Sequence, residues 1–206
     1  MCPKKPASSL LEKIQAPNST KPTPCMSIFG MKPVYSPFWN NTVPNRTTDM
    51  DTATLQWRLA TPVDEPLLIP MIRRFYAEDA TPFDSLRSLP ALRTLLADPT
   101  SGEVLLWLTS QGEHVGYAVL TLCCSLELGG RYVLLDELYL EPAVRGRGYG
   151  RHAIAHLEAR VQALGFDLLR MEVNHHNNAA KRLYLALGYR DEHRDLLSRR
   201  LNETSR

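Results

Sequence analysis

The chain has 206 residues, a net charge of +2 and 44% hydrophobic residues, which fits one domain with an appendage. It contains no apolar run near the roughly 20 residues that cross a bilayer, which excludes a transmembrane class. Residues 1–49 hold six Lys or Arg against two acids, whereas the remainder is slightly acidic. A folded part without a basic face argues against a nucleic-acid-binding protein.

The four cysteines are unsuited to disulfides. Cys123 and Cys124 are neighbours in an expected strand, where their side chains would point to opposite faces. Cys2 and Cys25 fall in the N-terminal segment, which lacks the apolar core of a secretory signal. Free thiols favour a reducing compartment, so we expect a cytoplasmic protein.

The N-terminal segment differs in composition from the rest. Residues 1–50 contain eight of the fifteen prolines and many Ser, Thr, Asn and Lys residues. Such a stretch cannot bury enough apolar surface to offset its ordering entropy. We therefore predict a mostly disordered, Pro-rich extension over 1–50 and a folded domain over 51–206. A start of translation at Met26 or Met50 is left open.

The folded part begins with a strand and two helices. Alternating side chains predict a strand over 54–60. Residues 61–64 supply an N-cap Thr, a first-turn Pro and an acid, and so start a helix that runs through Phe75. A second helix fits 86–97. Three strands then follow, over 103–109, 114–126 and 132–140, joined by short turns.

The pattern changes after Pro142. A Gly/Arg loop opens a long helix near Gly148, and Gly165 ends that helix. A strand over 168–173, a helix over 178–187 and a last strand over 196–201 complete the chain. Together these elements predict an α/β (α+β) fold, with a mixed, mostly antiparallel central sheet flanked by helices.

The loop Arg145-Gly146-Arg147-Gly148-Tyr149-Gly150 is suited to binding an anion. Glycines permit close backbone approach, and amides at a helix N-terminus attract a diphosphate. A P-loop would need Gly-Lys-Ser/Thr, and a dinucleotide fold would need glycine where Arg151 stands. A pantetheine diphosphate and a simple tight turn with solvated arginines remain as alternatives.

Two sequence motifs, the loop and a segment downstream of it, resemble those of a known family. The loop matches the R/Q-x-x-G-x-G/A signature of the GNAT acetyltransferases, and it follows an acid-bearing strand over 134–142 as in that family. Downstream, residues 177–189 match N-x-x-A-x-x-x-Y-x-x-x-G-F/Y at every fixed position. Over residues 54–201 the chain therefore resembles the GNAT superfamily of acetyl-CoA-dependent N-acetyltransferases.

The resemblance implies acetyl-CoA as cosubstrate and a general acid. Amides of the Gly/Arg loop would bind the diphosphate, the strand end would bind the pantetheine arm, and Tyr184 would protonate the departing thiolate. Asn177 would orient the cofactor or a water molecule. The implied cofactor-binding residues are Leu138, Tyr139, Leu140, Arg145, Gly146, Arg147, Gly148, Tyr149, Gly150, Arg151 and Asn177.

Two carboxylates are candidates for the base that deprotonates the acceptor. Asp136 and Glu137 are adjacent in a strand, so alternation would place them on opposite faces. Polyamine acetyltransferases resemble this segment and carry an acid at the position of Asp136, whereas Glu137 remains a close alternative. Either one could instead be a solvated carboxylate at the sheet edge.

We thus predict acetyl transfer to a primary amine by direct attack in a ternary complex. A non-catalytic CoA-binding sensor and a protein N-acetyltransferase are the alternatives. The expected partner is a small amine-bearing molecule, with neither nucleic acid nor membrane, and a homodimer is left open. Acids expected to attract a cationic acceptor are Glu78, Asp79, Asp84, Glu127, Asp136 and Glu137.

We predict no metal site. His152 and His156 are four residues apart on the expected long helix, but no third ligand stands at a useful spacing. We interpret both histidines as solvent-facing.

Overall fold

A computed structural model describes residues 55–201, so the extension predicted over 1–50 lies outside the described residues. One five-stranded sheet has the order β1-β2-β3-β4-β5. Its strands are β1 (Gln56–Leu59), β2 (Gly102–Leu108), β3 (His114–Ser125), β4 (Gly130–Leu140) and β5 (Leu169–Met171). The first four strands pair antiparallel and β5 joins β4 in parallel. The mixed, mostly antiparallel sheet is confirmed.

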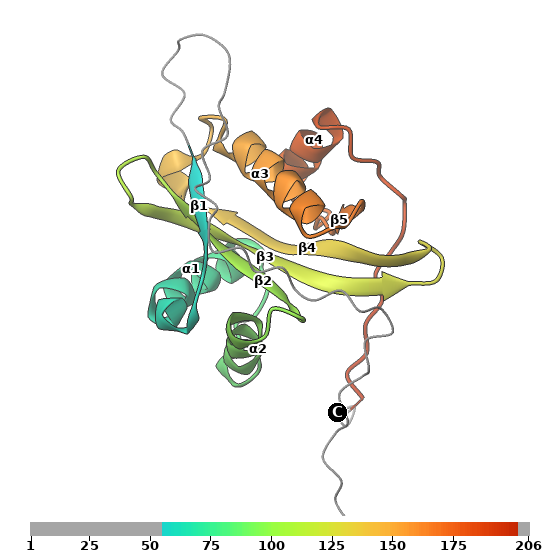
Figure 1. Cartoon of the computed structure of the whole chain (residues 1–206), viewed down its shortest axis with the longest axis horizontal. Helices are drawn as coiled ribbons and strands as arrows, with labels where there is room; N and C mark the ends of the chain where they lie inside the picture. The colour runs from blue at the N-terminus through green and yellow to red at the C-terminus, as the bar shows by residue number, and fades with distance from the viewer. Residues whose placement is uncertain (1–54, 202–206) are drawn as a thin grey trace, which may run out of the picture. The chain divides into compact units, whose positions relative to one another are not determined.

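Helices cover both faces of the sheet, with α1 and α2 on one face and α3 and α4 on the other (Figure 1). They are α1 (Glu65–Glu78), α2 (Ser85–Ala97), α3 (Tyr149–Ala163) and α4 (Asn178–Ala186), with 3-10 turns η1 (Pro62–Asp64) and η2 (Pro142–Val144). β2 is buried on both faces: Leu105 and Trp107 lie in the α3 core, whereas Val104 and Leu106 lie in the α1–α2 core. Burial on both faces explains why the sequence of β2 is a nearly continuous apolar run without polar alternation.

The start of the first helix differs in detail from the prediction. A 3-10 turn over Pro62–Asp64 precedes α1, and the Asp64 carboxylate accepts hydrogen bonds from both the amide (2.8 Å) and the hydroxyl (3.0 Å) of Thr61. Asp64 also pairs with Arg58 of β1 at 2.7 Å. Thr61 is thus the N-cap of the 3-10 turn, whereas Asp64 is the N-cap of α1 and also anchors the turn to the sheet.

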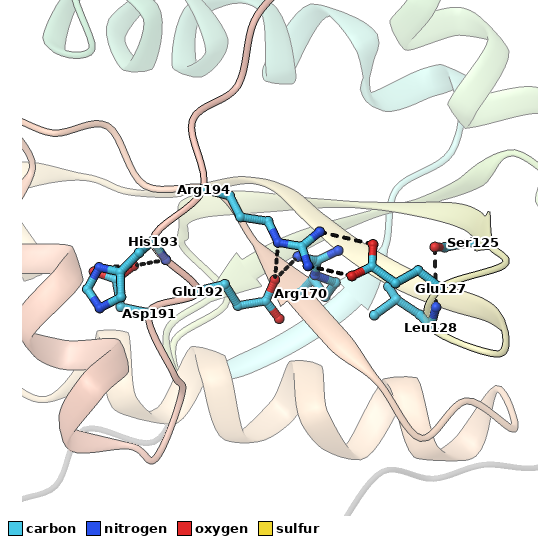
Figure 2. Close-up of polar contacts among 8 residues, drawn as sticks. All are labelled: Ser125, Glu127, Leu128, Arg170, Asp191, Glu192, His193 and Arg194. Atoms are coloured by element: carbon cyan, nitrogen blue, oxygen red, sulfur yellow. Dashed lines mark hydrogen bonds and ion pairs between the residues drawn. The ribbon is translucent and has the colours of Figure 1, made fainter.

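The prediction of a last strand over 196–201 is wrong. No described residue after α4 belongs to a strand, and Leu196, Leu197 and Leu201 are 75, 91 and 86% exposed. The segment is instead held by ion pairs, in which Arg194 bridges Glu127 and Glu192 (Figure 2). A strand is stable only when its backbone N–H and C=O groups form hydrogen bonds with an adjacent strand. An alternating pattern of side chains does not by itself provide that adjacent strand.

His156 also departs from the prediction. Its ring is half-buried and tilted against Trp107, and its Nε2 atom lies 3.0 Å from the carbonyl oxygen of Leu55. Desolvation lowers the pKa of His156, because burial disfavours the charged ring. This histidine therefore fixes the N-terminal end of β1 to α3 and does not face solvent.

Over residues 55–201, none of the helices is both long enough and apolar enough to cross a membrane. Within the same residues, no group of three or more His, Cys, Asp or Glu side chains could hold a metal ion.

Candidate active site

The sheet opens between β4 and β5. β5 pairs only with Val133, Leu134 and Leu135, so the remainder of β4 has a partner strand on one side alone. The amide of Glu141 donates a hydrogen bond to the carbonyl oxygen of Val115 in β3. The N–H and C=O groups of successive residues in a strand are directed alternately to one side and the other. The backbone groups of Leu138 and Leu140 are therefore directed toward the open side, where they can bind an extended ligand as an added strand would.

The Gly/Arg loop lies between η2 and the start of α3. Gly146 and Gly148 have φ values of 76° and 84°, a left-handed conformation that strains other residues. Tyr149 is buried at 5% exposure and fixes the helix start to the core. Among the described residues, none accepts a backbone hydrogen bond from the amides of 146–150. These amides and the positive end of the helix dipole fit a diphosphate.

Two exposed arginines of this loop region, Arg147 and Arg151, flank those amides. Arg145, in contrast, is directed to the open side of β4, where its Nε atom donates to the carbonyl oxygen of Leu140. Its guanidinium also pairs with Glu78 of α1 at 2.8 Å and lies 5.2 Å from the centre of the Tyr139 ring. The side chain of Arg145 thus connects the loop, β4 and α1.

A β-bulge changes the geometry of the two candidate bases. Val119 of β3 faces Glu137 and Leu120 faces Leu135, so Asp136 is an extra residue without a partner. Leu135 and Leu138 consequently face the same α3 core although they are three residues apart. The simple alternation assumed for Asp136 and Glu137 therefore does not hold, because a bulge shifts the side-chain pattern by one residue.

Glu137 is half-buried and held by two phenols. The hydroxyl of Tyr76 donates to one carboxylate oxygen at 2.8 Å and that of Tyr117 donates to the other at 2.6 Å. Desolvation raises the pKa of Glu137, although both phenols act in the opposite direction. The carboxylate therefore has a fixed position on the α1–α2 side of the sheet.

Asp136 has a different environment. Its side chain reaches solvent, and within residues 55–201 no group donates a hydrogen bond to it or forms an ion pair with it. Desolvation by the surrounding protein nevertheless raises the pKa of Asp136 above that of an ordinary aspartate. This carboxylate is hence free to bind a substrate proton.

Tyr184 projects from α4. Asn177 begins this helix, because its side-chain oxygen accepts a hydrogen bond from the amide of Ala180 at 3.1 Å. The Tyr184 ring packs against Tyr189 with centroids 6.0 Å apart, and burial raises its pKa to about 12. The phenol stays protonated at neutral pH, as a general acid requires.

An open pocket of about 230 Å³ lies at the end of α1, and its lining does not include Tyr184, Asp136 or Glu137. Its lining residues are Phe75, Glu78, Asp79, Arg145, His176 and Asn177. The carboxylate of Asp79 accepts a hydrogen bond from Asn174 at 3.1 Å and lies 3.6 Å from His176. The pocket thus joins the end of α1 to the Gly/Arg loop and to the segment before α4.

Not all of the acids expected around an acceptor line this pocket. Asp84 caps α2, accepting from the amide of Leu86 at 3.0 Å, and pairs with Arg87. Glu127 lies in the β3–β4 turn and pairs with Arg194 (Figure 2). Both acids therefore have structural partners away from the pocket: Asp84 pairs at the start of α2, and Glu127 pairs with a residue distant in sequence.

The open strand edge, the glycine loop at a helix start and the tyrosine on the following helix define an acetyltransferase fold. The chain belongs to the Acetyltransferase (GNAT) family, whose sequence model matches residues 69–189. It is therefore an acetyltransferase by family.

Solved structures agree with this fold. An integron cassette protein from the mobile metagenome of Cole Harbour Salt Marsh is 31% identical over 72% of this chain and 92% of its own, with a TM-score of 0.60. An aminoglycoside acetyltransferase from an uncultured soil metagenomic sample is 17% identical over 72% and 97%, with a TM-score of 0.59. A ribosomal-protein-alanine N-acetyltransferase from Brucella melitensis biovar Abortus 2308 is 18% identical over 71% and 99%, with a TM-score of 0.56. Among curated protein sequences, none matches the chain.

Proposed function

We propose that the protein transfers an acetyl group from acetyl-CoA to a primary amine of a small cationic molecule. The unpaired edge of β4 supports this proposal most strongly, because it joins the glycine loop to two carboxylates that have no cationic partner within residues 55–201. A cationic acceptor would supply the missing positive charge.

Acetyl-CoA would lie along the open edge. The free amides of 146–150 fit its diphosphate, and Arg147 and Arg151 add positive charge. Leu138 and Leu140 would hydrogen-bond the pantetheine arm. An outward amide of this edge would also stabilise the oxyanion that forms during attack on the thioester.

The acceptor approaches from the α1–α2 side. Its ammonium gives one proton to Asp136, and the freed nitrogen attacks the thioester carbonyl. The carbon–sulfur bond then breaks as the nitrogen loses a second proton to water and the amide forms. The thiolate takes a proton from Tyr184, and solvent restores both side chains with net release of one proton. We assign the base to Asp136, since both oxygens of Glu137 already accept hydrogen bonds.

The test is CoA release, followed with a thiol reagent, over a panel of acceptors. The panel contains spermidine, kanamycin, lysine and a peptide with N-terminal alanine, the last because one structural neighbour is named for that acceptor. We expect turnover with spermidine or kanamycin. Acetylation of the peptide alone would contradict the small-molecule acceptor, and binding of acetyl-CoA without any turnover would favour a CoA sensor.

A further inference from the structure

Two phenols from different elements converge on one carboxylate. Tyr76 lies in the last turns of α1 and Tyr117 lies in β3, yet both hydroxyls donate to Glu137 of β4 at 2.8 and 2.6 Å. A carboxylate bound through both oxygens by charge-assisted hydrogen bonds loses its freedom to rotate.

An aromatic cluster fixes the two phenols in turn. Tyr117 is fully buried, and its ring packs edge-on against Phe75 and lies 5.9 Å from the ring of Tyr139. The Tyr76 ring packs against Phe75 and Phe83 at 5.9 and 5.8 Å. Because these rings cannot turn without disturbing the core, the position of the Glu137 carboxylate is set by the α1–α2 core.

Glu137 forms no ion pair within the described residues, and two nearby acids act on its charge. Asp136 on the same strand and Asp79 at the end of α1 both disfavour ionisation of Glu137, whereas the phenols of Tyr76 and Tyr117 favour it. Burial and the charge of Glu137 raise the pKa of both phenols, so they remain donors throughout the neutral range. In the absence of a cation, the two phenols are what keeps a half-buried anion stable here.

We propose that Tyr76 and Tyr117 are positioning residues that hold Glu137 as a fixed anion for the acceptor's ammonium group. This inference rests on the proposed function and assigns a different role to each of the two acids. Glu137 binds and orients the ammonium through the lone pairs that the phenols leave open, and Asp136 takes the proton. Neither tyrosine touches the reacting atoms, because each acts through Glu137.

The first test compares Tyr76→Phe with a matched tyrosine variant. Tyr132→Phe is the matched control, because it also removes a phenol hydroxyl and Tyr132 lies on the same strand as Glu137. The hydroxyl of Tyr132 interacts with the thiol of Cys123 and not with Glu137. With spermidine as the probe, we expect Tyr76→Phe to raise the KM for the amine about ten-fold, with little change in kcat or in acetyl-CoA affinity. Tyr132→Phe should behave as the unchanged protein.

A double-mutant cycle shows whether Tyr76 acts through Glu137. We expect Tyr76→Phe to have no further effect on the KM for the amine once Glu137→Gln is present. Additive effects of the two substitutions would overturn the positioning role. Tyr117→Phe, which removes the second donor, should reproduce the same coupling if it folds.

A measurement without turnover completes the test. In protein with ¹³C-labelled glutamate carboxyls, assigned with Glu137→Gln, the pKa of Glu137 should rise by about one pH unit in Tyr76→Phe. An unchanged pKa would contradict the hydrogen bond from Tyr76 to Glu137 on which the proposal depends. A wild-type protein that acetylates no amine would overturn the proposed function, whereas an active wild type with an unaltered KM in Tyr76→Phe would overturn only the positioning role.

Discussion

The Nε atom of Arg145 donates a hydrogen bond to the carbonyl oxygen of Leu140 at 2.7 Å. This carbonyl lies on the open side of β4, where the pantetheine arm is proposed to bind. The same guanidinium pairs with Glu78, so the proposed binding of acetyl-CoA would have to compete with a contact that already links the loop to α1. Release of Arg145 would also free Glu78 for a cationic acceptor.

Weakening that contact should therefore tighten cofactor binding. The Arg145–Glu78 pair is exposed, with 42 and 43% of the two side chains accessible, and such pairs contribute less than about 1 kcal/mol. We expect Glu78→Gln to lower the Kd for acetyl-CoA about two- to three-fold by calorimetric titration. Glu127→Gln breaks a comparably exposed pair at the β3–β4 turn and serves as control. Weaker binding in Glu78→Gln would contradict the competition.

Substitution of Gly148 should abolish acetyl-CoA binding without unfolding the domain. A Cβ atom placed at Gly148 has no atom within 4 Å beyond the adjacent residues, so there is local space for a side chain, and the charge of a glutamate would repel the diphosphate. Gly112→Glu is a matched control, because Gly112 has φ 83°, close to the 84° of Gly148, and equally open surroundings. Both variants should lose similar thermal stability through left-handed strain. Retained binding in a folded Gly148→Glu protein would refute the diphosphate site.

Removal of the Tyr184 hydroxyl tests the general acid. Tyr184→Phe keeps the packing against Tyr189 and should lower kcat about 10²–10⁴-fold with little change in acetyl-CoA affinity. Because the pKa of Tyr184 is raised to about 12, its ionisation should cause no loss of wild-type rate between pH 7 and about pH 10. Near-normal turnover of Tyr184→Phe would mean that water protonates the thiolate.

Asp136 should control the acidic limb of the rate profile. A base must be deprotonated to act, and desolvation raises the pKa of Asp136, so kcat/KM should fall as pH decreases through a value above the usual aspartate range. We expect Asp136→Asn to lower kcat severely, by about 10²-fold or more, and to remove this limb. Glu137→Gln should mainly raise the KM for the amine. A larger loss of kcat in Glu137→Gln would reverse the two roles.

Asp64 should make stability depend on pH. Hydrogen bonds from Arg58 lower the pKa of Asp64 well below its ordinary value, and Thr61 contributes in the same direction. A lowered folded-state pKa gives stability that is present above the unfolded value of about 4 and is lost as pH falls through the folded value. At pH 7, Asp64→Asn should lower the free energy of unfolding by about 2 kcal/mol, measured by denaturant titration. An equal difference at pH 7 and at pH 3 would contradict this linkage.

The glycine loop could be predicted because its backbone conformation is local in sequence. The glycines at 146 and 148 depend on backbone conformations that neighbouring residues dictate. Asn177, for which the family resemblance implies a role in orienting the cofactor, is found in addition to cap α4. The strand over 196–201 could not be predicted in the same way. Its leucines have no neighbouring strand among the described residues, and pairing is a property of the sheet rather than of the segment.

The sequence by itself determined the family, the mixed sheet and the positions of the glycine loop and Tyr184, because periodicity and turn chemistry act over a few residues. Only the tertiary structure decided how Asp136 and Glu137 differ. The bulge opposite Val119 and Leu120 interrupts the alternation, and the phenols that hold Glu137 come from residues 61 and 20 positions away in the chain. Contacts between elements distant in sequence depend on how helices and strands pack together, and no local pattern encodes them.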